Sequence, residues 1–349
     1  MIRPIKIGNV LLGRANTVVI QSMTNTRTTD IEATIAQINA LQTAGCELVR
    51  VAVPDFESAH AIREIASRTS VPLIADIHFD YRLALEAMKC GASKIRINPG
   101  NIGSEEKVAE IVKVARERSV AIRVGSNTGS IKSAYLSKYD RATALAESAL
   151  DQVRLLERLG FEEIVISAKS SSVVENYKSN VYIRKKTEYP IHLGITEAGL
   201  GDEAIVKSSI GMGALLMQGI GETIRVSITG DPLREVHIAR TLLSAIGKTS
   251  EPQLISCPTC ARTEIDVEVL ARDVKRWLSE SHTNAPITVA VMGCVVNGIG
   301  EGKHADLGIA GTKTGAVIFS KGKIIETVRR SEVREKFLGI LGNLIGGDS

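Results

Sequence analysis

The chain has 349 residues, more than a single hydrophobic core usually organises, so a single small domain is excluded and two domains are expected. Apolar residues make up 44% and charged residues 23% of the sequence, which excludes an intrinsically disordered chain. The net charge is +4 and no basic run is interleaved with aromatic residues, so we expect no nucleic-acid partner.

Short β-branched segments alternate with longer amphipathic segments from about residue 17 to residue 247, as in repeated β–α units on a parallel sheet. The predicted strands are 17–21, 47–53, 72–77, 93–98, 120–124, 163–168, 190–195 and 223–228. Helical patterns between them include 29–44, 57–67, 105–118, 141–159 and 232–246. Eight such units suggest closure into a (β/α)8 barrel of the TIM type, with a doubly wound open sheet as the alternative.

Polar residues recur where the predicted strands end, and this recurrence favours the barrel. They are Arg50, Asp76, His78, Arg96, Asn98, Arg123, Asn127, Lys169, Thr196, Glu197 and Ser227. In a barrel these strand ends converge on one mouth, where active sites lie. Guanidinium forks and a lysine ammonium facing one cavity can hold phosphate oxygens. We therefore expect residues 1–250 to form a domain that binds a small anionic substrate, such as a diphosphate.

Two acidic positions at the strand ends have more than one interpretation. His78 lies beside Asp76 in the sequence, and the pair fits a metal site, an acid–base pair or a hydrogen-bonded structural histidine. Glu197 fits either a proton donor or a partner that neutralises an arginine. The Gly199–Gly201 and Gly211–Gly213 pairs do not fit a dinucleotide-binding loop, because neither lies in a strand-to-helix turn with an acidic residue suitably placed downstream.

The alternation of strand and helix patterns ends near Gly247. Residues 248–252 form a predicted linker into a second domain at residues 251–349. The elements expected there are a helix at 263–281, a strand at 287–292, a glycine-rich loop at 297–302, a strand near 306–309, a hairpin at 316–328 and a closing helix from 331. This order predicts a compact α+β domain.

Five cysteines, without an evident secretion signal or an apolar run long enough to cross a membrane, indicate reduced thiols in a cytoplasmic protein. Cys46 and Cys90 lie at predicted helix ends and are assigned to packing. The remaining three are Cys257 and Cys260, which flank Pro258 and Thr259, and Cys294 at the end of a predicted strand.

Three thiolates leave a tetrahedral metal site incomplete. His304 could complete a zinc site, Cys257 and Cys260 alone could form a redox couple, and a [4Fe–4S] cluster could take all three cysteines. The proline within the pair, the glycine-rich segment after Cys294 and the nearby Glu301 favour the cluster. A carboxylate from Glu301 would be a weak, exchangeable fourth ligand that leaves a position for a substrate oxygen.

Taken together, the motifs closely resemble the family of 4-hydroxy-3-methylbut-2-en-1-yl diphosphate synthases, also called the IspG or GcpE family. The most specific segments are VIQSMT (19–24), ADIH (75–78), RINPG (96–100), RVGSNTG (123–129), GITEAG (194–199), ISCPTCAR (255–262) and VMGCVVNG (291–298). The resemblance runs essentially from end to end. The large insertion between domains found in plant-type members is missing, so the chain resembles the short, two-domain bacterial form.

The resemblance implies a barrel followed by an α+β [4Fe–4S] domain, with Cys257, Cys260, Cys294 and Glu301 as cluster ligands. It implies reductive conversion of 2-C-methyl-D-erythritol 2,4-cyclodiphosphate into 4-hydroxy-3-methylbut-2-enyl diphosphate on the methylerythritol phosphate route to isoprenoids. Reduced flavodoxin or ferredoxin would donate two electrons, and a head-to-tail homodimer would bring each cluster domain to the partner's barrel. The implied diphosphate-binding residues are Arg50, Arg96, Arg123, Asn127, Lys169 and Ser227.

The same chemistry needs a proton for loss of the hydroxyl as water, and Glu197 is the leading candidate, with His78 and Thr196 as lesser ones. Two competing interpretations remain. One is a barrel lyase or transferase for a phosphorylated or pterin-like substrate, with a structural zinc on the three cysteines and His304. The other is a non-enzymatic iron–sulfur sensor or scaffold, which has no need of a cationic barrel mouth.

Overall fold

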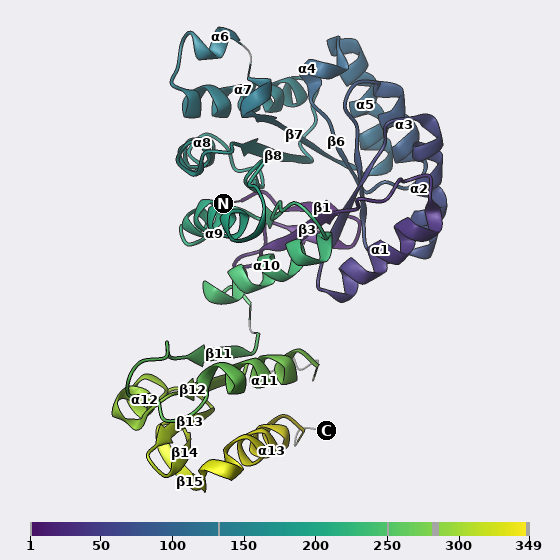
Figure 1. The fold of residues 1–349 in the computed structure, drawn as a ribbon. Coiled ribbons are helices and arrows are strands. Elements are labelled where there is room, and N and C mark those ends of the chain that lie inside the picture. Colours follow the sequence, from purple (N-terminus) through teal and green to yellow (C-terminus); the bar gives the residue numbers. More distant parts are fainter. Residues whose placement is uncertain (1, 132, 250, 281–285, 347–349) are drawn as a thin grey trace. The chain divides into compact units, whose positions relative to one another are not determined.

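The computed structural model describes residues 2–131, 133–249, 251–280 and 286–346 (Figure 1). It divides into two compact units, residues 1–248 and 249–349, which are considered separately below. Residue 250 of the predicted linker and residue 281 at the end of a predicted helix lie outside the described residues. Within the described ranges, no helix combines the length and apolar character that a membrane span requires.

The first unit is a barrel of parallel strands. Its eight-stranded sheet has the order β8-β7-β6-β5-β4-β3-β10-β9. An isolated parallel bridge between Ile166 and Ile191 joins its two ends and confirms the predicted (β/α)8 barrel. The strands are β3 (Val19–Met23), β4 (Leu48–Ala52), β5 (Leu73–Asp76), β6 (Lys94–Arg96), β7 (Ala121–Asn127), β8 (Ile164–Lys169), β9 (His192–Leu193) and β10 (Thr223–Ile224).

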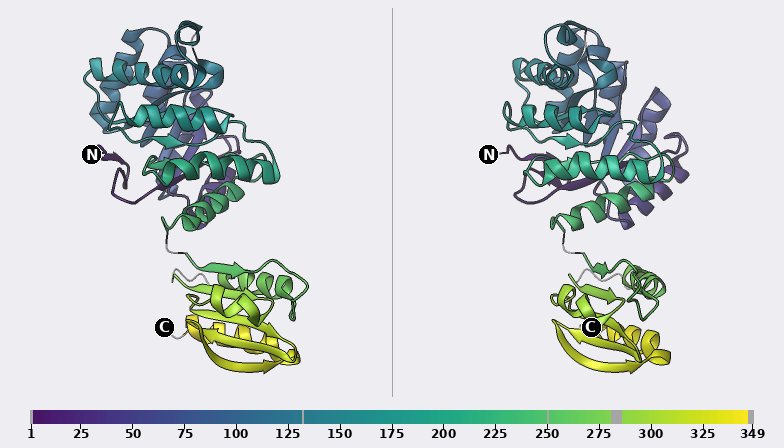
Figure 2. Two further views of the ribbon diagram at one scale, coloured as in Figure 1. Left: turned by 90° about the vertical axis from the view of Figure 1, so that its left-hand side faces the viewer. Right: turned by 60° about the vertical axis from the view of Figure 1, so that its left-hand side comes forward.

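Helices alternate with these strands along the chain and surround them (Figures 1 and 2). They are α1 (Ile31–Thr43), α2 (Phe56–Arg68), α3 (Tyr81–Lys89), α4 (Pro99–Ile102), α5 (Glu105–Arg118), α6 (Ser133–Leu136), α7 (Arg141–Arg158), α8 (Val173–Arg184), α9 (Gly201–Leu216) and α10 (Pro232–Ala245). Aspartates at positions 30, 55, 80, 140 and 231 cap α1, α2, α3, α7 and α10 by accepting hydrogen bonds from first-turn N–H groups. These caps satisfy backbone donors that have no partner within the helix, so they fix where each helix begins.

A hairpin that the sequence analysis did not predict precedes the barrel. It pairs β1 (Ile5–Ile7) antiparallel to β2 (Val10–Leu12). Ile5, Ile7 and Leu12 are buried in one cluster with residues at the beginnings of strands β3, β4, β5, β7 and β8. The hairpin therefore packs against the amino-terminal end of the barrel, and the carboxyl end of the strands is the end left for a site.

The barrel interior changes from apolar to charged along the strand direction. Because side chains alternate between the two faces of a strand, every second residue faces the interior. The layer next to the hairpin is mainly apolar, with Val19, Leu48, Ile74, Ala121 and Val165, and the strand register puts Lys94 at the level of Ile74 and Ala121. Two residues further along the same strands lie Gln21, Arg50, Asp76, Arg123 and Ser167. The fold thus places polar and charged groups above an apolar floor.

The second unit is a five-stranded mixed sheet with the order β11-β12-β13-β14-β15. The first three strands are parallel, and the last two add an antiparallel hairpin. Residues of α11 and α13 share one core cluster with the sheet, whereas Ile299 of α12 packs against another. The elements are β11 (Gln253–Ser256), α11 (Val267–Glu280), β12 (Thr288–Met292), α12 (Val295–Glu301), β13 (Leu307–Thr312), β14 (Gly315–Ser320), β15 (Lys323–Arg329) and α13 (Val333–Gly346).

In this unit one prediction was wrong and one strand was missed. The predicted glycine-rich loop at 297–302 is wrong, because most of it belongs to helix α12. A Cβ atom on Gly298 would lie 2.8 Å from the Cβ of Met292 and 3.1 Å from that of Ala310, so this glycine lets the helix approach the sheet closely. Strand β11, which ends directly before Cys257, was not predicted at all.

Candidate active site

Cationic side chains from five positions around the barrel gather at the carboxyl end of its strands. We call this set the cationic ring, and it consists of Arg50, Arg96, Arg123, Lys169 and Arg225. The strand register places Asp76 opposite Arg96 and Arg96 opposite Arg123, so three adjacent strands carry charged groups at one level. The parallel register of the barrel therefore assembles the ring from residues that are far apart in the sequence.

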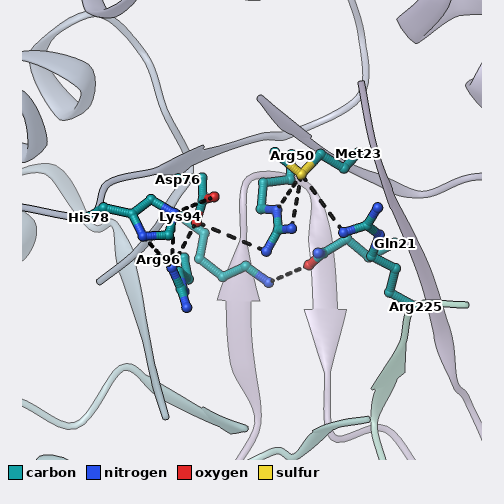
Figure 3. Close-up of polar contacts among 8 residues, drawn as sticks. All are labelled: Gln21, Met23, Arg50, Asp76, His78, Lys94, Arg96 and Arg225. Atoms are coloured by element: carbon teal, nitrogen blue, oxygen red, sulfur yellow. Dashed lines mark hydrogen bonds and ion pairs between the residues drawn. The ribbon is translucent and has the colours of Figure 1, made fainter. Parts of the chain in front are cut away.

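Two carboxylates contact the ring. Asp76 Oδ1 lies 3.4 Å from Nη1 of Arg96 and 4.0 Å from Nη1 of Arg50 (Figure 3). Glu235 of α10 accepts hydrogen bonds of 3.2 Å from Nε and Nη2 of Arg225. Burial favours the neutral acid at Asp76, but the nearby Arg50, Arg96 and Arg123 outweigh it, and the pKa of Asp76 is lowered. Five cations against two carboxylates leave an excess of positive charge.

A methionine occupies the space between two of the arginines. Arg50 donates from Nε and Nη2 to Sδ of Met23, at 3.0 and 2.9 Å, and Nη1 of Arg225 lies 3.8 Å from the same sulfur (Figure 3). A thioether is a weak hydrogen-bond acceptor, so these guanidinium groups keep donor capacity for a stronger partner.

Arg123 shows most clearly that the ring has more positive than negative side chains. Its side chain is 4% exposed, and its Nε and Nη1 atoms are buried without a hydrogen-bond partner among the described residues. Burial, together with the charges of Arg50 and Arg96, lowers its pKa well below the usual range. A buried guanidinium with unused donors is unfavourable unless an anion pairs with it. The site is therefore arranged for an anionic ligand.

Lys169 reaches the ring because the neighbouring strand carries a glycine. A Cβ atom on Gly194 would lie only 2.6 Å from Nζ of Lys169 and 2.8 Å from the carbonyl oxygen of Arg225. Burial, and then the charges of Arg123 and Arg225, lower the pKa of Lys169 well below its usual value. Burial likewise lowers the pKa of Arg50 to about 10. An incoming anion would relieve the repulsion within the ring.

The predicted proton donors follow the carboxyl ends of β5 and β9, and His78 contacts the ring. Nε2 of His78 lies 3.2 Å from Oδ2 of Asp76 and 3.2 Å from Nη1 of Arg96, and half of the His78 side chain is exposed. Thr196 and Glu197 follow β9, and the N–H of Thr196 donates to the carbonyl of Ser170. Glu197 is exposed and adopts a left-handed φ of 53°, a conformation that is strained for a residue with a side chain.

The other predicted site residues also lie at strand ends. Asn127 pairs in register with Lys169, and Asn98 caps α4 through a hydrogen bond to the N–H of Gly100. Ser227 follows β10 and is partly buried.

Sequence analysis missed several polar residues of the barrel interior. Arg225 lies two residues before Ser227, and Lys94 lies two residues before Arg96, so strand alternation was the signal that could have identified both. Gln21 and His192 also face this interior, and both are almost completely buried.

In the second unit, the cysteines follow two adjacent parallel strands. Cys257 comes directly after β11 and Cys294 two residues after β12, so both lie at the same edge of the sheet. The N–H of Gly293 donates to Sγ of Cys257 at 3.0 Å, which brings the two segments into contact. Cys260 is exposed, and its N–H donates to Oγ1 of Thr263.

These residues fit a soft metal centre in their chemistry. Three exposed or partly exposed thiols are available, and N–H···S hydrogen bonds such as the one from Gly293 are among the contacts that tune cluster ligands. Within the described part of the chain, no three potential ligand side chains stand together as a preformed metal site. Glu301 is the last residue of α12, and the seven residues of that helix span about 10 Å between it and Cys294.

Cys46 and Cys90 differ from the other cysteines. They are 2% and 4% exposed and belong to the core of the barrel unit, which confirms their assignment to packing. Burial raises the pKa of Cys46 to about 12. The raised pKa makes this thiol a poorer metal ligand than an exposed cysteine, in keeping with a role in packing.

Comparison with known proteins matches both units to one family. The family described as "GcpE TIM-barrel domain" matches residues 2–240, and that described as "GcpE protein C-terminal domain" matches residues 253–343. The chain is 52% identical to a relative from Caldanaerobacter subterraneus over 96% of this chain and 95% of the relative. It is 52% identical to one from Thermotoga maritima over 99% and 98%. Both relatives are named "4-hydroxy-3-methylbut-2-en-1-yl diphosphate synthase (flavodoxin)".

Solved structures share the fold at low sequence identity. Dihydropteroate synthase from Yersinia pestis matches with a TM-score of 0.51 and 13% identity over 70% of this chain and 98% of that chain. 3-Dehydroquinate dehydratase from Geobacillus kaustophilus matches with a TM-score of 0.50 and 16% identity over 70% and 96%. At these identities the similarity supports the fold alone.

Proposed function

The chain belongs to the GcpE family over nearly its whole length, and on that premise we propose that it is an iron–sulfur oxidoreductase of isoprenoid biosynthesis. It converts 2-C-methyl-D-erythritol 2,4-cyclodiphosphate, two electrons and a proton into 4-hydroxy-3-methylbut-2-enyl diphosphate and water. The observation that carries the proposal is Arg123, a buried guanidinium whose Nε and Nη1 donors have no partner among the described residues. An anion at the barrel mouth supplies that partner.

The cationic ring holds the diphosphate through all of its members except Arg225, which is paired with Glu235. Asn127 and Ser227 lie at the same strand ends and add an amide and a hydroxyl as donors. Binding energy from the two phosphates fixes the reacting carbons in place and so lowers the barrier to the later steps. The proposed diphosphate-binding residues are Arg50, Arg96, Arg123, Asn127, Lys169 and Ser227.

The second unit holds a [4Fe–4S] cluster on Cys257, Cys260, Cys294 and Glu301. When bound, this cluster supplies the electrons one at a time. The N–H of Gly293 donates to Sγ of Cys257 and orients that ligand. Side chains on a helix lean toward its amino-terminal end, so Glu301 leaves α12 on the side of Cys294.

Glu301→Ala tests the carboxylate as a fourth, exchangeable ligand. We expect the variant to keep most of its iron and sulfide, because three thiolates remain, but to lose turnover. Metal analysis and product assays on the same preparation measure both effects. Full activity of Glu301→Ala would remove Glu301 from the ligand set.

Polar residues that follow the strand ends deliver the proton. Glu197 is exposed and held in a strained backbone conformation, which is common for residues at functional sites. We assign it the role of proton donor to the departing hydroxyl. His78, hydrogen-bonded to Asp76, and Thr196 are the lesser candidates.

Reduced flavodoxin is the proposed electron donor, as in the names of the relatives, with ferredoxin as the alternative. We propose a homodimer in which the cluster unit of one subunit serves the barrel of its partner. Mixing subunits of Arg123→Met and Cys257→Ala, at a substrate concentration too low to fill the Arg123→Met ring, tests this arrangement, because one site in such a heterodimer has both an intact ring and an intact cluster. Recovery of activity on mixing is expected, and its absence after demonstrated subunit exchange would contradict shared sites.

The direct test is an anaerobic assay with the cyclic diphosphate and reduced flavodoxin. We expect mass spectrometry to detect the open-chain allylic diphosphate. A preparation that holds one zinc and no iron would instead favour the barrel lyase. Unchanged substrate in the presence of a complete cluster would contradict the proposed reaction.

A further inference from the structure

A lysine to which the proposed function gives no role lies beneath the cationic ring. Lys94 is on β6, two residues before Arg96, so its side chain enters the barrel one layer closer to the apolar floor. It is completely buried, and its Nζ atom lies 3.3 Å from Oε1 of Gln21 (Figure 3). Throughout the described residues, no carboxylate lies within ion-pair distance of this amine.

The groups around Lys94 oppose a positive charge on it. Gln21 on β3 is neutral, and Arg50 on β4 and Arg123 on β7 are cations. Burial, and then the charges of Lys169 and Arg123, lower the pKa of the buried His192 on β9 well below its usual value. Burial, followed by the charges of Arg123 and Arg50, lowers the pKa of Lys94 well below its usual value.

The carboxylates that could offset this charge are already engaged. Asp76 on β5 contacts Arg50 and Arg96, and Glu235 contacts Arg225. The protonation state of the amine therefore depends on what occupies the ring above it.

We propose that Lys94 couples anion binding to proton uptake: its amine is uncharged while the ring is empty and accepts a proton from solvent when an anion fills the ring. An anion bound between Arg50 and Arg123 offsets the two charges that repel an ammonium at Lys94. The proton leaves a solvent or buffer molecule and forms a bond to Nζ, and no bond within the anion changes. Binding and protonation then strengthen each other, because they are linked equilibria.

This coupling has a consequence for the reaction, which rests on the proposed function. In the cyclic diphosphate each phosphorus carries one ionised oxygen, so the substrate has two negative charges. Opening of the ring breaks a carbon–oxygen bond and leaves a further phosphate oxygen, which gives the product a third charge. A protonated Lys94 offsets that added charge from below the ring, where water does not reach it.

Calorimetry tests the proposal with the intact cluster-loaded protein under anaerobic conditions and without a reductant. The cyclic diphosphate is titrated at about pH 8, far from its own ionisations, in buffers with different ionisation enthalpies. The dependence of the binding heat on the buffer gives the number of protons taken up. We expect uptake by the wild-type protein and up to one proton less in Lys94→Met, whereas the exposed-site control Lys89→Met matches the wild type.

The proton number separates coupling from a merely structural role, which would change affinity or stability but not protonation. Equal uptake in Lys94→Met and wild type would overturn the proposal. Should Lys94→Met fail to fold, Lys94→Gln takes its place, because Lys169 could also take up a proton in the wild type. Binding by the wild type without any proton uptake between about pH 7 and 9 also overturns the proposal.

Sulfate, whose charge is fixed at neutral pH, serves as a second probe and separates this inference from the proposed function. Sulfate binding with proton uptake, but no binding of the cyclic diphosphate, would sustain the role of Lys94 and contradict the function. Binding of both anions without proton uptake would leave the function intact and remove the role of Lys94.

Discussion

The two reactive regions of this protein are constructed in opposite ways. The cationic ring is buried and built on strand ends, where the register of a parallel barrel sets the level of each charge. The cysteines lie in exposed or partly exposed loops after β11 and β12 and form no ready-made metal site among the described residues. The contrast shows that the register of the strands can position all the cationic side chains of an anion site before the anion binds. A cluster site on loops is completed by the metal centre itself.

Removal of a proposed cluster ligand should have the largest effect. We expect Cys257→Ala to lose its iron and sulfide and all detectable turnover, because a loop site with two thiolates cannot hold the cluster. Metal analysis and anaerobic assays check this prediction. Cys90→Ala, which alters a buried cysteine of the barrel core, is the matched control and should keep both. Equal iron content in the two variants would show that Cys257 is not a ligand.

Replacement of the proposed proton donor comes next. Glu197→Gln keeps the shape and the strained backbone of the residue but cannot donate a carboxyl proton, so the rate of product formation should fall by about 100-fold or more. Affinity for the cyclic diphosphate should stay near that of the wild type. Rapid-quench kinetics and calorimetry measure the two quantities, with Glu203→Gln on α9 as an exposed control. An unchanged rate would exclude Glu197 from proton delivery.

A single change in the ring should weaken substrate binding without affecting the cluster. Arg123→Met removes charge-assisted hydrogen bonds worth about 1.5–3 kcal/mol, which corresponds to roughly a 10- to 100-fold loss of affinity. Calorimetry with the cyclic diphosphate measures it, and Arg118→Met, on the exposed side of α5, is the control. If Arg123→Met lost its iron as well, the two regions would not be independent.

The smallest effect concerns stability and pH in the ligand-free protein. Burial lowers the pKa of Lys94 in the folded state well below its usual value of 10.5, so between the folded and the unfolded pKa the unfolded state binds more protons than the folded state. Stability should therefore rise with pH across the range between the two pKa values, by at most about 1.4 kcal/mol per pH unit for one lysine.

Lys94→Met should be more stable than the wild type near neutral pH and should show a flatter dependence of stability on pH. Denaturant titrations at several pH values measure both quantities. Lys169 shows the same direction of pKa shift, so part of the slope should remain in the variant. Identical slopes in the two proteins would mean that Lys94 is charged in the empty barrel.

The sequence predicted the barrel well because each strand is a short β-branched run bounded by turn residues. It failed for the hairpin of β1 and β2, since three-residue strands carry almost no periodic signal. It failed for α12 because three glycines resemble a loop. In the structure, Gly298 instead allows the helix to pack closely on Met292 and Ala310.

The sequence predicted the site residues at the strand ends but not those deeper in the barrel. Residues at strand ends, such as Arg96 and Lys169, stand out because they interrupt apolar runs. Lys94 lies further inside the strand of Arg96, and Arg225 lies two residues before Ser227, so their roles depend on which face of each segment turns inward. His192 was missed for the same reason, since only closure of the barrel brings it beneath Lys169.

The measurement that tests the account most directly is the electron stoichiometry of product formation. Cluster-loaded protein is given an excess of the cyclic diphosphate and a limiting, known amount of reduced flavodoxin, and both the product and the oxidised flavodoxin are counted. The proposed reaction yields one allylic diphosphate for every two electrons consumed. Product that forms without consumption of the reductant, or a reductant that is consumed without product, would contradict it.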